Sequence, residues 1–163
     1  AIAGIAVGTV SLPVLSKAFK TKNLSKVSKI QNKSIELSLL FSIPASIGLI
    51  IASEEIINGL FGYGSFNSED VLKTSNALMF FGYGVVAFAI VKIFANFFFA
   101  RNNTKTPFYI SSLIVLLNIS ISISFFDRIG FIIIPIATSI STWVGVFVYL
   151  YYLNNMHTSM TLF

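Results

Sequence analysis

Long apolar runs, separated by short polar stretches, make up most of this 163-residue chain. A helix needs about 20 apolar residues to cross the ~30 Å hydrocarbon core of a lipid bilayer. The runs therefore predict five membrane-spanning helices, at residues 1–19, 34–52, 68–100, 106–126 and 129–153. At ~1.5 Å per residue the third helix is longer than the bilayer is thick, and Gly82 and Gly84 indicate a bend inside it.

The stretches between these runs predict the connecting elements. Residues 54–60 predict a short interfacial helix after the second span. Ser68, followed by Glu69 and Asp70, predicts the N-cap of the third span, because a hydroxyl accepts a backbone hydrogen bond there and acids favour the positive helix end. The expected fold class is all-α, a polytopic membrane protein with one transmembrane domain over residues 1–163.

The composition agrees with a lipid environment. Hydrophobic residues make up 55% of the chain and charged residues 10%, whereas a soluble domain is about 25% charged. The chain has no cysteine, which excludes disulfides and thiolate metal sites. Its first apolar run begins at Ala1 without an initiator methionine, so we expect a fragment of a longer polytopic protein.

The lysines predict how the chain is oriented in the membrane. Six lysines and no acid lie within residues 16–33, at Lys17, Lys20, Lys22, Lys26, Lys29 and Lys33. Cytoplasmic loops collect Lys and Arg, so segment 20–33 is predicted to be cytoplasmic and the acid-bearing segment 53–67 periplasmic. The lysine spacing is typical of an amphipathic helix lying on an anionic inner leaflet. The net charge of +5 is thus a loop bias and predicts no nucleic-acid binding.

The sequence predicts a protein that is not an enzyme. It contains no phosphate-binding P-loop, no zinc-protease motif and no nucleophile elbow of a hydrolase. Its one histidine, His157, lies in a polar tail, where we expect a solvated side chain.

Two charged residues lie within or near the predicted spans. Lys92 lies nine residues before Arg101, which places it ~13 Å into the membrane from the cytoplasmic end. Its ammonium either extends along the helix to the interface or faces a cavity and meets an anionic substrate or a carboxylate. Glu36, close to Lys33, is interpreted as an interfacial acid at the start of the second span.

Small polar residues gather on the last two spans. They are Asn118, Ser120, Ser122 and Ser124 on the fourth, and Thr138, Ser139, Ser141 and Thr142 on the fifth. Such residues let transmembrane helices approach and hydrogen-bond each other. Alternatively, two facing stripes supply neutral oxygens to a cation such as sodium. Pro135 has no N–H and would free the carbonyl of Phe131 for the same purpose.

Three stretches resemble the MurJ (MviN) family of lipid II flippases. Residues 4–19 read GIAVGTVSLPVLSKAF, which is similar to the G-x-A-x-x-T-x-x-L-P-x-L-S span of that family. Residues 41–70 read FSIPASIGLIIASEEIINGLFGYGSFNSED, which resembles its proline-containing span and the loop that follows. Residues 81–107 read FGYGVVAFAIVKIFANFFFARNNTKTP, which resembles its V-K and A-R-x-D-x-x-T-P run, with Asn102 and Asn103 replacing a polar-acidic pair.

This resemblance implies a function and a setting. The family belongs to a superfamily of exporters with two helical lobes and alternating access, and the chain resembles about spans eight to twelve, in the C-terminal lobe. Membership implies transport of lipid II, the undecaprenyl-pyrophosphate-linked peptidoglycan precursor, from the inner to the outer leaflet of the bacterial cytoplasmic (inner) membrane. The essential cavity arginines lie mainly in the N-terminal lobe, so that missing lobe and the membrane lipids are the implied partners. In this segment Lys92 is the candidate cavity residue.

Some members of the family bind sodium in the C-terminal lobe. The resemblance places Asn118, Thr138 and the carbonyl of Ile134 at three of the ligand positions. Ser122 falls where the sodium-binding members carry an acid, so the site implied here has lost a charge. Na⁺ is the one cofactor that the resemblance suggests.

Two other functions stay open from the sequence. One is a cation-coupled drug or polysaccharide exporter of the same superfamily, and the other is a non-transporting membrane scaffold. A cationic cavity in the upstream lobe would favour the flippase, whereas a neutral aromatic cavity would favour the drug exporter. A scaffold predicts that the upstream cavity arginines are missing.

Overall fold

The computed structural model describes residues 2–21, 23–64 and 66–160. Within them there are helices and no strand, which confirms the predicted all-α fold class. The elements are α1 (Ile2–Lys20), α2 (Leu24–Ile51), α3 (Ser53–Phe61), α4 (Ser68–Ala100), α5 (Lys105–Ile129), the 3-10 helix η1 (Gly130–Ile132) and α6 (Ile133–Met160). His157, expected in a polar tail, falls in the last turns of α6, outside the residues whose side chains are described.

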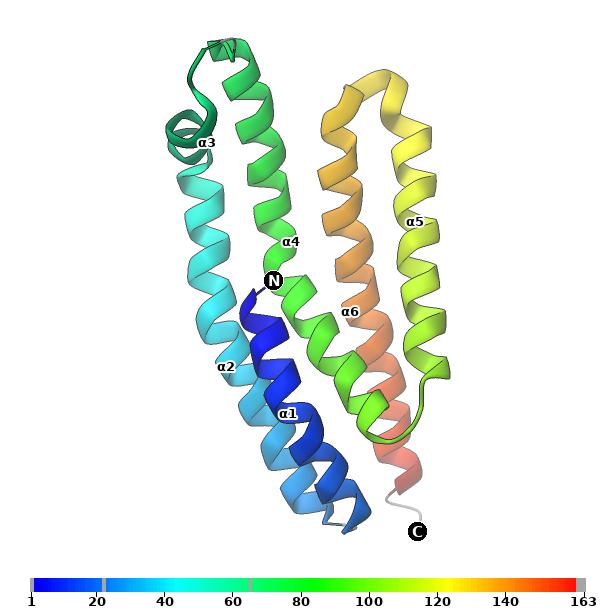
Figure 1. The fold of residues 1–163 in the computed structure, drawn as a ribbon. Coiled ribbons are helices and arrows are strands. Elements are labelled where there is room, and N and C mark those ends of the chain that lie inside the picture. The colour runs from blue at the N-terminus through cyan, green and yellow to red at the C-terminus, as the bar shows by residue number, and fades with distance from the viewer. Residues whose placement is uncertain (1, 22, 65, 161–163) are drawn as a thin grey trace.

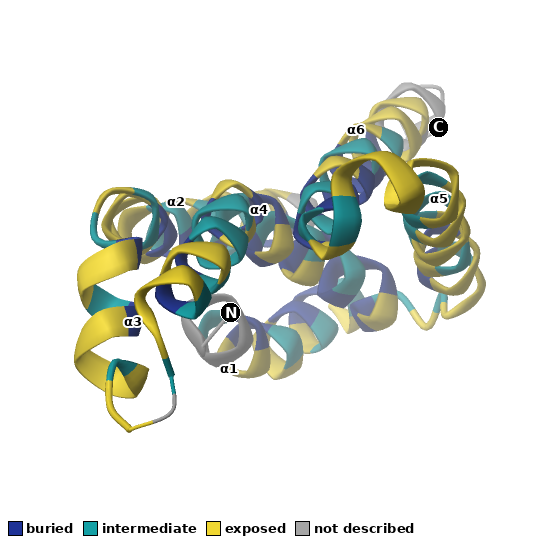
Figure 2. Cartoon of the chain, turned by 90° about the horizontal axis from the view of Figure 1, so that it is seen from above, coloured by how far each residue is buried: buried dark blue, intermediate teal, exposed yellow. Residues whose placement is uncertain are grey.

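The helices form a bundle with α4 at its centre. α4 packs against α1, α2, α3 and α6, whereas α5 packs mainly against α6. Seen from above, α2, α4 and α6 form one row, with α1 and α5 set against it (Figure 2). Consecutive long helices run in opposite directions, so the α1–α2 and α4–α5 connections lie at the lower end of Figure 1, and α3 lies at the upper end.

The two ends of the bundle carry opposite charge. The α1–α2 and α4–α5 connections at the lower end, with the helix ends that flank them, carry Lys17, Lys20, Lys26, Lys29, Lys33, Arg101 and Lys105. We call residues 17–33 and 101–105 the lysine end. Towards the upper end lie Glu54, Glu55, Glu69, Asp70 and Asp127, with Lys73 and Arg128. The fold therefore places the segments predicted to be cytoplasmic and periplasmic at opposite ends.

The helices have the length and surface of membrane spans. Three stretches of the described residues are long and apolar enough to cross a bilayer, namely Ser25–Ile51, Ser68–Ala100 and Lys105–Asn155. The last of these contains both α5 and α6, which are folded back on each other in Figure 1. Large apolar side chains are exposed on the outer faces, among them Phe41, Ile51, Leu116, Ile123 and Phe147. An apolar surface of this extent is typical of contact with lipid.

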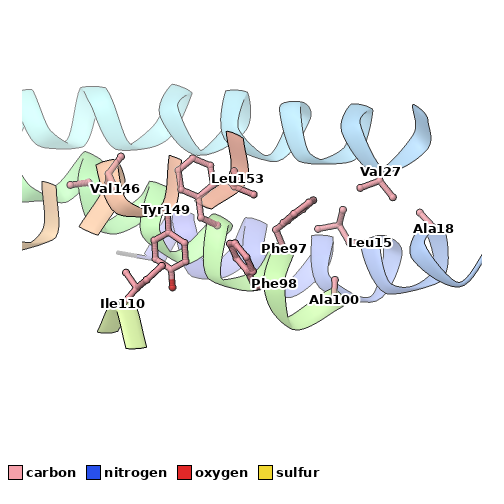
Figure 3. Close-up of a cluster of buried hydrophobic side chains, with 12 residues drawn as sticks. Leu15, Ala18, Val27, Phe97, Phe98, Ala100, Ile110, Val146, Tyr149 and Leu153 are labelled. Carbon is pink, nitrogen blue, oxygen red and sulfur yellow. The ribbon is translucent and has the colours of Figure 1, made fainter. Parts of the chain in front are cut away.

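α2 begins at Leu24, not at residue 34, so residues 24–33 are helical and not part of a loop. The side chain of Asn23 caps the helix by accepting a hydrogen bond from the Lys26 N–H over 2.9 Å. Val27 is buried opposite α1, and Ile30 packs on the same core (Figure 3). These apolar contacts continue the helix through the lysines, so the predicted separate amphipathic helix is instead the first turns of α2.

α4 begins at Ser68 as expected, but its N-cap is Asn67 and not Ser68. The Asn67 side chain accepts hydrogen bonds from the N–H groups of Glu69 and Asp70, over 2.9 and 3.0 Å. The Asp70 carboxylate in turn accepts the Asn67 N–H over 3.2 Å. This reciprocal capping box satisfies N–H groups that a helix start leaves unpaired, and it fixes where α4 begins.

The middle of α4 receives hydrogen bonds from two neighbouring helices. Ser46 Oγ of α2 donates to the carbonyl of Gly82 over 2.7 Å. Ser139 Oγ of α6 donates to the carbonyl of Phe80, also over 2.7 Å. A carbonyl oxygen has two lone pairs, so it can accept such a bond beside its helical one. These two bonds fix α2 and α6 at the same level of α4.

Glycines allow this close approach. A Cβ atom at Gly84 would lie 2.7 Å from Ser139 Oγ, and one at Gly82 would lie 2.9 Å from a side-chain carbon of α2. Trp143 of α6 adds a third bond, from Nε1 to the carbonyl of Tyr83 over 3.0 Å. The axis of α4 changes direction about halfway along its length (Figure 1). Gly82 and Gly84 lie at this midpoint, where we expected the bend.

α2 turns a row of serines towards the bundle interior. Ser34, Ser38, Ser42 and Ser46 are all buried and recur every fourth residue. Residues at this spacing share one face of a helix, and small ones let two helices pack closely. The sequence interpretation placed hydroxyl stripes only on the last two spans and missed this one, although its spacing is visible in the sequence.

Below the bend the core is aromatic. Ring centroids of Phe19 and Phe97 lie 5.4 Å apart, those of Phe97 and Phe98 5.9 Å, and those of Phe98 and Tyr149 5.7 Å. The chain of rings joins α1, α4 and α6, and Figure 3 shows its last three members side by side. Edge-to-face and tilted pairs at these distances stabilise a core beyond the area that they bury.

We expect Gly84→Ala to lower the thermal stability of the full-length protein in detergent. In an open helix this change stabilises by up to ~1 kcal/mol, but at Gly84 the added methyl meets Ser139, and overpacking costs about 1–3 kcal/mol. Gly48→Ala in α2 is the matched control, because a Cβ there meets nothing within 4 Å. Equal melting temperatures for the two variants would contradict the close contact at Gly84.

Candidate functional site

Three of the predicted cation ligands are joined by hydrogen bonds between α5 and α6. Asn118 Nδ2 donates to Thr138 Oγ1 over 2.8 Å, and Thr138 Oγ1 donates to the carbonyl of Ile134 over 2.7 Å. Asn118 and Thr138 are both half-buried. The structure therefore brings together an amide, a hydroxyl and a carbonyl that come from two different helices.

Ser122, the fourth predicted ligand, lies one turn along α5 from Asn118. Its Oγ is buried and has no hydrogen-bond partner. Residues four apart lie on the same face of a helix, so this hydroxyl extends the polar face that Asn118 begins. A buried polar atom without a partner costs free energy, and it marks a place where a ligand oxygen or cation would be favoured.

The donor types fit a weakly bound alkali cation. Such ions take neutral amide, hydroxyl and carbonyl oxygens, and a flip of the Asn118 amide would present its oxygen to Thr138. Within the part of the chain that the structure describes, no group of three or more His, Cys, Asp or Glu side chains is placed to hold a metal. The cluster thus offers neutral oxygens without the carboxylate that would make a strong site.

The two hydroxyl stripes do not face each other along their whole length. Ser139 points to α4, as described above, and Ser141 and Thr142 both donate to the carbonyl of Thr138 within α6. The Phe131 carbonyl accepts the N–H of Ile133 at the start of α6. The α5–α6 contact is therefore polar at the Asn118–Thr138 pair rather than along two matched stripes.

Lys92 is exposed at the edge of a pocket of about 400 Å³ between α4, α5 and α6. Apolar side chains form most of its lining, namely Phe88, Val91, Ala95, Phe99, Pro107 and Phe108. Tyr149 and Ser111 also line this pocket, and no hydrogen bond of good geometry joins their hydroxyl groups. The lining includes no residue of the Asn118–Thr138 cluster, so the two candidate sites are separate.

Asn96 lies one turn after Lys92 on α4, and sequence reasoning missed it. It is 6% exposed, and a Cβ atom at Gly8 of α1 would meet its amide nitrogen. The same Cβ would lie 3.8 Å from Lys92 Cγ, so both polar side chains leave α4 beside α1. The sequence did contain a signal for it, because two polar residues four apart on a long apolar helix share one face of that helix.

Taken together, the fold and these two sites define a class of protein. It is a polytopic, all-helical membrane protein with an exposed lysine at the edge of a pocket and a separate polar cluster between α5 and α6. Interior polar groups of this kind mark pathways for ions or polar substrates, because lipid does not solvate them. The class is therefore that of polytopic helical membrane proteins with polar groups between their helices, and the comparisons with known proteins agree.

The chain belongs to the lipid II flippase MurJ family, whose model, described as "Lipid II flippase MurJ", matches residues 1–161. "Probable lipid II flippase MurJ" of Rhizobium meliloti is 35% identical over 144 residues, which cover 88% of this chain and 27% of that protein. The protein of the same description from Thermotoga maritima is 36% identical over 152 residues, covering 91% and 30%. "Lipid II flippase MurJ" of Thermosipho africanus is 34% identical over 142 residues, covering 87% and 29%.

A solved structure described as "Lipid II flippase MurJ, inward closed conformation" has the same fold. It matches with a TM-score of 0.85 and 32% identity over 93% of this chain. The match covers 32% of that structure, and the chain spans under a third of the length of each relative named above. The family and the long apolar helices place the chain in the cytoplasmic membrane as a multi-pass protein.

We expect a measurable coupling energy between Asn118 and Thr138. Asn118→Ala and Thr138→Val each remove one partner of the bond, and the double variant should destabilise by less than the sum of the two. Hydrogen bonds between membrane helices give about 0.5–1.5 kcal/mol in such cycles. The coupling energy is measured by unfolding the full-length protein in denaturing detergent. The same cycle at Ser120 and Thr138 is the control, because the Ser120 hydroxyl donates to a carbonyl of its own helix. Additivity within error for Asn118 and Thr138 would refute the bond.

Proposed function

We propose that this chain is the C-terminal-lobe segment of a lipid II flippase. The whole protein would carry undecaprenyl-pyrophosphate-linked peptidoglycan precursor from the inner to the outer leaflet of the cytoplasmic membrane by alternating access. The observation that carries this proposal is the family match over residues 1–161, together with the fold shared with a MurJ structure. The descriptions of the relatives favour this cargo over a drug or a polysaccharide, and transport over catalysis or a scaffold role.

Within such a transporter, Lys92 would face the substrate pathway. Its exposure at a pocket and its position beside α1 support a cavity-facing cation over one that extends to the interface. An ammonium there would attract the pyrophosphate of the precursor, while the apolar outer surface contacts lipid. The N-terminal lobe of the same protein would supply the opposite wall and most of the positive charge. The lysine end would lie in the cytoplasm, as the positive-inside rule predicts.

The test uses the full-length protein that contains this chain, in a bacterium whose own flippase can be depleted. We expect the protein to restore outer-leaflet exposure of the lipid-linked precursor, measured with a membrane-impermeant reagent that modifies the head group. Lys92→Met should lower exposure by about ten-fold, which corresponds to ~1.4 kcal/mol, whereas Lys92→Arg should retain most of it. Lys29→Met is the matched control, because Lys29 is exposed on α2, away from the pocket.

Two results would count against these assignments. If the correctly inserted wild-type protein leaves the precursor in the inner leaflet, it is not a lipid II flippase, and an exporter of other cargo or a scaffold is favoured. If wild-type protein restores exposure and Lys92→Met does so equally, the flippase function stands and Lys92 is not part of the pathway.

We further propose that the Asn118–Thr138 cluster binds a sodium ion weakly. The unpartnered Ser122 hydroxyl supports this, and so does the Thr138 hydroxyl, which lies between the Asn118 amide and the Ile134 carbonyl. The ion would neutralise the partial negative charge of these oxygens and hold α5 and α6 together, and binding coupled to transport would let a cation gradient bias the conformational cycle.

Ser122→Asp tests the sodium proposal by adding the carboxylate that the cluster lacks. We expect the variant to bind Na⁺ about ten-fold or more tightly than the wild type, because a charged ligand replaces a neutral one. The measurement is the melting temperature of the purified full-length protein as NaCl replaces choline chloride at constant ionic strength. Ser120→Asp, on the exposed side of the same helix, is the control. A sodium response equal in both variants would refute a site at Ser122.

A further inference from the structure

A second pocket lies at the lysine end, between the last turn of α1 and the turn that joins α4 to α5. Its volume is about 440 Å³. It is lined by Ser16, Phe19, Lys20, Ala100, Arg101 and Asn102. Two segments far apart in the sequence thus meet around one space and bring to it two cations, two neutral polar side chains and two apolar ones.

Aromatic rings hold the Arg101 guanidinium in place. Its central carbon lies 5.4 Å from the ring centroid of Phe19 and 5.8 Å from that of Phe97. At these distances a guanidinium is attracted to the faces of the rings. Burial lowers the pKa of Arg101, but an arginine stays protonated at any physiological pH. The pocket therefore has a fixed and partly dehydrated positive charge in its wall.

The turn that carries Arg101 is closed by backbone hydrogen bonds. The N–H groups of Arg101 and Asn102 donate to the carbonyls of Phe98 and Phe99, over 3.1 and 2.9 Å. Asn102 has a φ of 58°, a left-handed conformation that asparagine tolerates better than most residues. Its place on the rim is thus set by the backbone and not by a flexible loop.

The surroundings favour an anion. Besides Lys20 and Arg101, the lysine end carries Lys17, Lys26, Lys29, Lys33 and Lys105. The nearby acid, Glu36, is already paired with Lys33 over 3.1 Å. Like charges gathered at one end raise the local positive potential and attract anions.

Helix ends alone do not explain the arrangement. Lys20 closes α1 and Arg101 closes α4, and a cation is favoured at each of these negative helix ends. That effect acts on each helix separately and does not require the two cations to share a pocket. The stacking of Arg101 on Phe19 is what brings the second cation to the end of α1.

We propose that this pocket binds the phosphate group of an anionic phospholipid in the leaflet at the lysine end. Lys20 and Arg101 supply the opposite charge, and Ser16 and Asn102 supply neutral hydrogen-bond donors. The pocket lies where α1 and α4 end, at the level expected for head groups, and basic pockets between helix ends are suited to such lipids. The proposal does not depend on which cargo the protein transports.

The full-length protein in phosphatidylcholine nanodiscs tests this, with phosphatidylglycerol added in steps. Native mass spectrometry counts the anionic lipid that stays bound. Lys20→Gln should weaken the binding of phosphatidylglycerol about five-fold, because one basic residue near a lipid phosphate contributes about 1 kcal/mol. The double variant Lys20→Gln/Arg101→Gln should weaken it further. Because Lys20 is exposed, its single variant leaves the packing intact. Lys26→Gln is the control, since Lys26 is an exposed lysine outside the pocket.

A second arm separates the lipid from a free anion. Inorganic phosphate is titrated into nanodiscs without and with phosphatidylglycerol. Without this lipid, phosphate should not saturate a site at millimolar concentration, and with it, phosphate should not displace the bound lipid. Equal losses for Lys20→Gln and Lys26→Gln would overturn the proposal, because the lysine end would then act as a diffuse field. Displacement of the lipid by phosphate alone would also overturn it, in favour of a soluble anion.

Discussion

A membrane helix must satisfy its backbone polar groups inside the protein, because lipid offers no hydrogen bonds. In this chain polar groups meet inside the protein at the middle of α4, where side chains of α2 and α6 donate to three carbonyls within about one turn, those of Phe80, Gly82 and Tyr83. The glycines there allow contacts that a Cβ would prevent. This junction fixes α2 and α6 relative to α4, and α5 follows because it packs mainly on α6. The positions of both candidate sites therefore depend on it.

Local sequence signals were sufficient for most of the fold. Apolar runs and flanking charges are local properties, and they located the long helices and the short α3. The start of α2 was mispredicted because Lys26 and Lys29 make this stretch too polar to count as part of an apolar span. Val27 and Ile30 are buried there only because α1 packs against them. The cap at Asn67 was missed for a similar reason, since Asn67 and Ser68 are both good cap residues and only geometry chooses between them.

The candidate sites show where sequence reasoning stops. Thr138 and Ser139 are neighbours in the sequence, but successive residues of a helix point ~100° apart, so one meets α5 and the other α4. A run of polar residues in the sequence does not show which neighbouring helix each of them contacts. The pairing of Asn118 with Thr138 came from family resemblance, since nothing in the spacing alone sets the register of two helices. Asn96 and the stacking of Arg101 on Phe19 needed the packing of α1 on α4, which no local pattern gives.

The packing also explains why the Lys92 pocket exists where it does. α5 has few contacts with α4 and is held by α6, so a seam is left between α4 and α5 below the junction. Tyr149, whose ring packs on Phe98, lines the pocket in this seam, and Lys92 lies at its edge. A buried charged group is costly unless it is paired, whereas a side chain at the edge of a seam remains accessible. The same loose contact between α4 and α5 therefore leaves the Lys92 side chain exposed, as the proposed role in the substrate pathway requires.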